Sequence, residues 1–100
     1  MSSDFSARRA DAAFNVLQVE MLQEQALALG HHARLVEQAM AALRSCDGAP
    51  AIRHELVRAA ARAVWAYFVQ REACGLNDHR QVIRDYAIPG EVLARLGAME

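Results

Sequence analysis

Apolar residues recur at alternating intervals of three and four positions through the first part of the chain, a spacing that places them on one helix face. This row, the seam, consists of Val19, Leu22, Ala26, Leu29, Ala33, Val36, Met40 and Leu43. A second apolar row repeats every seven positions beside the seam and contains Phe14, Met21, Ala28, Leu35 and Ala42. Heptad rows of this kind are typical of coiled coils and long packed helices. The pattern predicts a long helix over residues about 4–45.

Gly30 and the two histidines after it raise the alternative of a chain reversal in the middle of this helix. The seam keeps its phase across the glycine, which a turn would have no reason to preserve. Gly30, His31 and His32 fall on the polar face, where glycine costs a helix about 1 kcal/mol relative to alanine. We therefore favour a continuous helix whose residues 30–32 face water. A hairpin at Gly30 would instead close the chain into a compact helical bundle.

Glycine and proline mark the ends of the other predicted elements. Gly48 can end the first helix in a left-handed conformation, and Pro50 suits the first turn of the next helix. Gly75 can stop that second helix, while Pro89 ends a third helix and opens a fourth. β-Branched residues are few and show no alternating strand pattern. We therefore expect one all-α domain over residues 1–100. Its helices are predicted at residues about 4–45, 51–74, 78–87 and 89–96.

The second predicted helix changes character along its length. A narrow polar stripe in its first half gives way to Trp65 and Val69, so its second half is apolar nearly all round. A helix of this kind is buried on most of its sides. We therefore expect Trp65 either to pack beneath the two short helices, which we favour, or to anchor a subunit interface, where aromatic residues are common.

One charged residue interrupts the apolar face of the second helix. Arg71 falls among apolar positions, and a guanidinium group there must reach water or pair with a carboxylate. Asp85 on the third predicted helix is a candidate partner, as are Glu72 and the acids of the first helix. The sequence thus indicates a structural ion pair for Arg71, and a buried pair with Asp85 is one of these candidates.

The two long helices differ in length, and this difference has a consequence for assembly. At about 1.5 Å per residue, the first helix would span roughly 60 Å and the second roughly 36 Å. The apolar rows of the first helix would then face water unless the short helices or a second subunit cover them. We therefore expect a homodimer with the long helices antiparallel, or a higher homo-oligomer. The expected core or interface residues are Val19, Leu22, Leu29, Val36, Met40 and Leu43, with Trp65 as an anchor.

Charge and composition exclude several classes of protein. The net charge is −1, from 11 basic and 12 acidic residues, which argues against a general binder of nucleic acids or other polyanions. No apolar run approaches the length of a membrane span, and the start of the chain does not have the pattern of a signal peptide. With only two cysteines, we expect free thiols in the reducing cytoplasm.

The chain shows no constellation typical of a metal site or a catalytic centre. His31 and His32 are adjacent, so their side chains diverge on a helix, whereas chelation from one helix requires a spacing of four. Cys46 and Cys74 lie at opposite ends of the second predicted helix, and neither has an evident base beside it. We therefore expect neither enzymatic activity nor a cofactor.

An alternative function is suggested by residues 80–96, which are spaced like a DNA-binding helix-turn-helix motif. Ala87 could occupy the turn of that motif. However, Ile83 stands where the motif usually needs a smaller residue, and the reading helix would begin with Gly90 and Glu91. Such a helix offers few hydrogen-bond donors to phosphates or base edges. DNA binding is therefore the less favoured hypothesis.

The stretch AYFVQREACGLNDHRQVIRDYAIPGEVLARLG, residues 66–97, resembles a family of small uncharacterised bacterial helical proteins, catalogued as a domain of unknown function. The resemblance covers about the last third of the chain. It implies an all-α fold, and it carries no activity, ligand or catalytic residue to these positions. We therefore expect a self-associating structural or protein-interaction module.

Overall fold

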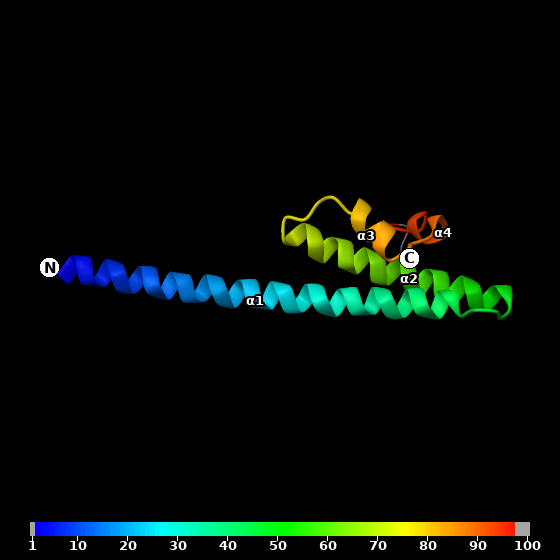
Figure 1. Cartoon of the computed structure of the whole chain (residues 1–100), viewed down its shortest axis with the longest axis horizontal. Coiled ribbons are helices and arrows are strands. Elements are labelled where there is room, and N and C mark those ends of the chain that lie inside the picture. Colours follow the sequence, from blue (N-terminus) through cyan, green and yellow to red (C-terminus); the bar gives the residue numbers. More distant parts are fainter. Residues whose placement is uncertain (1, 98–100) are drawn as a thin grey trace.

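The structure, a computed structural model of the chain, describes residues 2–97 and contains only helices and connecting turns in that range. This confirms the all-α prediction. A long helix packs on a second one, and two short helices follow (Figure 1). The helices are α1 (Ser2–Arg44), α2 (Pro50–Ala73), α3 (Arg80–Asp85) and α4 (Gly90–Leu93).

Helix α1 runs without interruption through Gly30, so the continuous helix is confirmed and the hairpin alternative is wrong. His31 is exposed as predicted, but His32 is half-buried, and its Nδ1 atom is buried without a hydrogen-bond partner. Gly30 is also half-buried, so the prediction that residues 30–32 all face water is wrong for Gly30 and His32. For His32, the reason is that it lies one helical turn from the fully buried Val36, so it borders the packed face of α1.

A short turn reverses the chain after α1, and α2 returns antiparallel along the C-terminal half of α1 (Figure 1). The Cys46 N–H donates to the Leu43 carbonyl and closes the end of α1. Ala49 is extended, with φ −61° and ψ 154°, and Pro50 occupies the first turn of α2. Proline fits there because the first N–H groups of a helix have no partner within it. The turn and the start of the second helix therefore lie where the sequence predicts them.

Helix α1 contributes to the hydrophobic core only through its C-terminal half, which packs against α2. Small residues of α2 allow the two helices to approach closely, and residues from α3, α4 and the segment between them close the core. Each fully buried valine contributes about 1.5–3 kcal/mol relative to an exposed one. The core residues are Val36, Met40, Leu43, Val57, Ala60, Ala61, Val64, Tyr67, Phe68, Val82, Ile88 and Val92.

Helices α2 and α3 end in the same hydrogen-bonded motif. After α2, Gly75 has φ 84°, its N–H donates to the Glu72 carbonyl, and the Leu76 N–H donates to the Arg71 carbonyl. After α3, Ala87 has φ 50° in the same left-handed region, and the Ile88 N–H donates to the carbonyl five residues before it. These are Schellman caps, which favour glycine at the left-handed residue. Gly75 therefore stops α2 as predicted.

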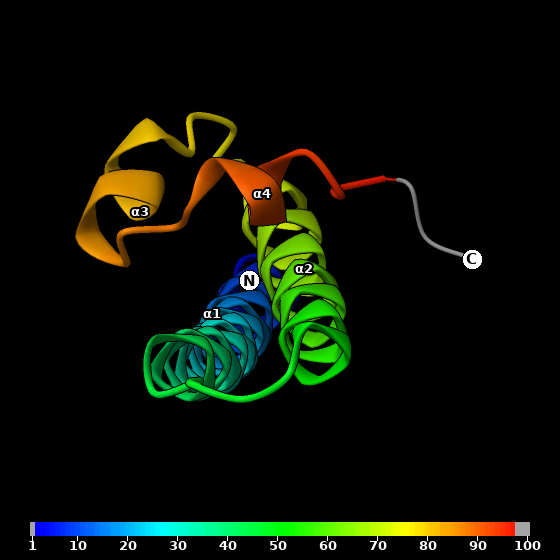
Figure 2. The same cartoon turned by 90° about the vertical axis from the view of Figure 1, so that its right-hand side faces the viewer.

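Helix α4 packs against α2, while α3 lies over the side of the hairpin that α1 occupies (Figure 2). The Tyr67 ring on α2 meets the Tyr86 ring edge-on, with 6.3 Å between centroids. Both short helices are shorter than the sequence predicts. Pro89 is extended, with φ −73° and ψ 156°, and only one helical turn follows it.

The molecule is elongated, because among the described residues only the C-terminal half of α1 packs against another helix. Its principal extents are 74 × 26 × 19 Å, and its radius of gyration is 19.8 Å. A compact domain of this length would have a radius of gyration of about 13 Å. Among residues 2–97, no helix is long and apolar enough to cross a membrane.

Candidate functional site

The first half of α1 projects beyond the rest of the molecule. Every residue from 4 to 24 is exposed, and we call this segment the overhang. At 1.5 Å per residue, the overhang is about 30 Å long. Figure 1 shows it extending past the end of α2. The overhang is the largest feature of the structure that packing within the chain does not explain.

The seam continues from the core into the overhang without changing phase. In the core half, Val36, Met40 and Leu43 are at most 5% exposed, and Leu29 packs against them. In the overhang, Val19 is 54% exposed. The same helix face is therefore buried by α2 at one end and bare at the other.

Other large apolar side chains accompany Val19 on the overhang. Single exposed apolar residues are ordinary on protein surfaces, whereas many of them on one segment point to an interaction site. Here they are distributed around the helix, since Leu17 lies about half a turn from Val19 and Leu22. All members of this group are more than half exposed. They are Phe5, Phe14, Val16, Leu17, Val19, Met21 and Leu22.

Charges on the overhang are of both signs and unevenly placed along it. Arg8 and Arg9 lie towards the start of α1, and the Arg9 guanidinium lies 5.6 Å from the centre of the Phe5 ring. Glu20 and Glu24 lie towards its other end. Asp4 and Asp11 flank the two arginines, so the start of the overhang carries no net side-chain charge and its other end is acidic.

A surface hollow lies where α2 ends against α1. It is lined by Met21, Glu24, Gln25 and Ala28 of α1 and by Gln70 of α2, and its volume is about 310 Å³. Because Met21 and Glu24 also belong to the overhang, the hollow forms the inner boundary of the bare surface. At this hollow the part of α1 that α2 covers ends and the bare part begins.

Trp65 lies outside the core and is 44% exposed. A Cβ atom added at Gly97 would lie 3.8 Å from the Trp65 Cζ3 atom, so the chain after α4 passes close to the edge of this ring. The favoured packing beneath the short helices is therefore only partial. Sequence periodicity could show that this part of α2 is apolar all round, but not which of its sides lacks a neighbour.

Arg71 and Asp85 do not form the predicted buried ion pair. Asp85 is exposed and accepts a hydrogen bond from the Gln81 side chain on its own helix. The Arg71 Nη2 atom donates to the Asp78 carbonyl at 2.9 Å, and its Nε atom donates to His79 Nδ1 at 3.0 Å. The reason is that the turn after Gly75 brings the following loop back over Arg71.

His79 joins this loop to α2 through three contacts. Its ring stacks on Phe68 with 4.1 Å between centroids and 4° between planes. Because Nδ1 accepts from Arg71, the ring proton lies on Nε2, which contacts the Glu72 carboxylate at 3.0 Å. Sequence reasoning missed this contact set. The only indication of it in the sequence was a histidine eight positions after Arg71.

Asp78, in the same loop, forms an ion pair with Arg80, at 2.7 Å from carboxylate to guanidinium. Hydrogen bonds from the Arg80 side chain and backbone hold the Asp78 pKa well below its usual range. Both side chains are largely exposed, so this pair orders the loop surface rather than the core.

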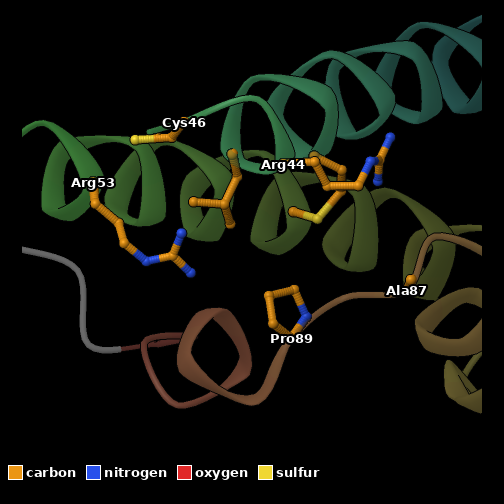
Figure 3. Close-up of a pocket in the computed structure, with 7 residues that line it drawn as sticks. Arg44, Cys46, Arg53, Ala87 and Pro89 are labelled. Atoms are coloured by element: carbon orange, nitrogen blue, oxygen red, sulfur yellow. The ribbon is translucent and has the colours of Figure 1, made fainter. Parts of the chain in front are cut away.

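A second hollow lies at the closed end of the α1–α2 hairpin (Figure 3). It has a volume of about 280 Å³ and an apolar floor that includes Met40 and Leu43. Figure 3 shows the Arg53 guanidinium directed towards Pro89, across the hollow. Arg53 already forms an ion pair with Glu91. The charge of Arg53 is therefore neutralised locally, and Arg44 also lines the hollow.

No catalytic or metal-binding arrangement emerges from the described part of the chain. Cys46 and Cys74 are free thiols, and the sulfur of Cys74 accepts a weak contact from Gln70 at 3.8 Å. Residues 2–97 contain no group of three or more side chains placed to hold a metal ion. The overhang therefore remains the strongest candidate site.

Comparison with known proteins supports the family resemblance over almost the whole chain. The profile of DUF6665, described as a family of unknown function, matches residues 3–100. The match extends far beyond residues 66–97, on which the resemblance was based. Neither a curated protein nor a solved structure gives a significant match.

Proposed function

The chain belongs to DUF6665, a family of unknown function, and we propose that it is a self-associating structural module whose overhangs pair to form a homodimer. One observation carries the proposal: the seam buries against α2 in the second half of α1, and its continuation through Val19 and Leu22 is bare. A second helix on the overhang would complete the packing that α2 begins.

The physical argument rests on how helices gain stability in water. An isolated helix of about 20 residues is marginal, and most helical stability in proteins comes from packing an apolar face. The overhang has such a face but no helix packed on it among residues 2–97. A helix from another chain would supply the missing contact through knobs-into-holes packing of the seam.

We propose a second copy as the occupant of the bare face. A homodimer with two-fold symmetry needs one surface that is complementary to itself. In such a pair each copy presents the same bare run of the seam, through Val19 and Leu22, to the other.

The test compares two substitutions of equal chemistry on the same helix. Leu22→Glu places a charge on the seam, and we expect it to convert the dimer to monomer in sedimentation equilibrium. Leu17→Glu is the control, because Leu17 is 54% exposed but lies about half a turn around α1 from the seam. We expect it to remain dimeric. Equal behaviour of both variants would refute the role of the seam.

This role needs neither a cofactor nor a catalytic group, and we propose neither. The DNA-binding alternative has less support, because α4 is a single turn and its Glu91 is already paired with Arg53. Two free, half-buried thiols suit a reducing compartment, so we propose that the protein acts in the cytoplasm.

A further inference from the structure

We infer that a hollow between the start of α2 and α4 binds a small organic monocarboxylate, with Arg95 holding the carboxylate group and the apolar lining contacting the rest of the molecule. This inference is independent of the proposed self-association. The hollow lies in the packed part of the molecule, whereas the overhang extends from its opposite end (Figure 1).

The hollow is formed by the first two turns of α2 on one side and by α4 with the turn after it on the other. Its volume is about 300 Å³, at the lower end of the range typical of small-molecule sites. Pro50 and Val57, of which Val57 is 4% exposed, supply its apolar lining. The other lining residues are Arg53, His54, Glu91 and Arg95.

Arg95 is the member of this set that lacks a charged partner. It is half-buried, and its Nη2 atom donates to His54 Nδ1 at 3.2 Å. Among residues 2–97, no carboxylate forms an ion pair with it. A guanidinium group carries five N–H donors, and arginine is normally paired when it is withdrawn from water. One neutral imidazole leaves most of these donors uncommitted, so they are available to a ligand.

The charges around the hollow favour a singly charged anion. Arg53 and Glu91 form an ion pair, so together they contribute no net charge. The first turn of α2 contains no acidic residue. Arg95 therefore leaves one uncompensated positive charge at the hollow. A monocarboxylate balances this charge, whereas a dianion would exceed it and lie near the Glu91 carboxylate.

The uncommitted donors also suit a carboxylate in their geometry. The planar guanidinium fork can bind both oxygens of a carboxylate through two parallel hydrogen bonds. Because His54 Nδ1 accepts from Arg95, the ring proton lies on Nε2, which is a further donor among the lining residues. Pro50 and Val57 offer only carbon atoms from their side chains, so they suit the organic part of the ligand.

Benzoate and benzamide test this assignment in the full-length chain, because they share a ring and differ in charge. We expect benzoate to cause saturable NMR shifts of the backbone amides of His54, Val57 and Arg95, and benzamide to cause none. Equal binding of the two compounds, or no saturable shift with benzoate, would overturn the inference. Tighter binding of inorganic phosphate at the same residues would overturn the assignment of a monocarboxylate.

Two substitutions that each remove one positive charge separate the role of Arg95 from a general effect of charge. Arg95→Gln should raise the benzoate dissociation constant at least about tenfold, the loss expected for a charge-assisted hydrogen bond. Arg62→Gln is the control, because Arg62 is exposed on α2 and does not line the hollow. It should change the constant less than twofold. Equal weakening by both would show that benzoate responds only to net charge.

Glu91→Gln tests the same site without altering Arg95, so it remains decisive if Arg95→Gln does not fold. It releases Arg53 from its carboxylate partner and removes the one acidic side chain among the residues that line the hollow. We expect the benzoate dissociation constant to fall at least threefold. Unchanged or weaker binding in this variant would contradict a carboxylate site.

Discussion

At the scale of single residues, the two Schellman caps both need a residue in the left-handed conformation, and they use different residue types for it. Gly75 adopts φ 84° without a side chain, whereas Ala87 adopts φ 50° with one. The left-handed conformation costs a residue with a Cβ atom about 1 kcal/mol. Ala87 is therefore a site of local strain that the surrounding packing sustains.

Ala87→Gly should raise the free energy of unfolding by about 0.5–1 kcal/mol, because glycine adopts this conformation without the steric penalty. Gly75→Ala should lower it by a similar amount. Urea denaturation measures both changes. A loss of stability in Ala87→Gly would show that residue 87 does not adopt the left-handed conformation.

His79→Ala should lower the free energy of unfolding by about 1–3 kcal/mol, because it removes the stack on Phe68 and leaves Arg71 with one hydrogen bond fewer. The exposed His31 is the control, and its alanine variant should change stability by less than about 0.5 kcal/mol. Nitrogen chemical shifts should place the His79 proton on Nε2. A proton on Nδ1 would contradict the contact with Arg71.

Tyr86 makes stability depend on pH at the alkaline end. Burial, together with the nearby Tyr67, raises its pKa above the ordinary value. The unfolded chain therefore ionises first, so this contribution is complete below about pH 10 and is lost as the pH rises through the folded-state pKa. Urea denaturation between pH 9 and 11 should show this loss in the wild type and a smaller loss in Tyr86→Phe. Equal losses in both would contradict the assignment.

At the scale of elements, what could be predicted depended on the length of the pattern. The seam of α1 extends over many turns, so its phase alone resolved whether Gly30 breaks the helix. The short helices offer too few positions for such a test, and Pro89 suited both a helix start and the extended residue before one. The extended conformation is the one observed.

The candidate site was predictable only where a periodic pattern marks it. Periodicity identified the seam and the two helix lengths identified the overhang, so Val19 and Leu22 could be singled out from sequence. Arg71 could be identified as needing a partner. Its actual partners come from a loop whose path depends on the Gly75 cap and the Phe68–His79 stack, neither of which has a periodic signal.

Gly30→Ala tests the continuity of α1 in the protein itself. An added Cβ atom would lie 3.5 Å from the Arg34 Nη1 atom, an ordinary contact, so space is available. Alanine should therefore stabilise the helix by up to about 1 kcal/mol. Thermal unfolding measures the change. A marked destabilisation would indicate a turn at residue 30, where glycine's conformational freedom is needed.

At the scale of the whole molecule, the shape is the consequence of one helix that is longer than its partner. The folded half of α1 forms a small helical unit with the rest of the chain, and the other half lies bare along about 30 Å. Each molecule has a packed end and a bare end. Pairing of two overhangs would give one symmetric rod with a packed helical unit at each end. It would also cover the apolar residues that the single chain exposes.

Small-angle X-ray scattering tests this account most directly, because it reports mass and length together. We expect twice the mass of the 11.0 kDa chain. We also expect a maximum dimension of roughly 120 Å, from two 74 Å molecules that overlap along their overhangs. A particle of 11.0 kDa at every concentration, or a dimer no longer than a single chain, would contradict pairing through the overhangs.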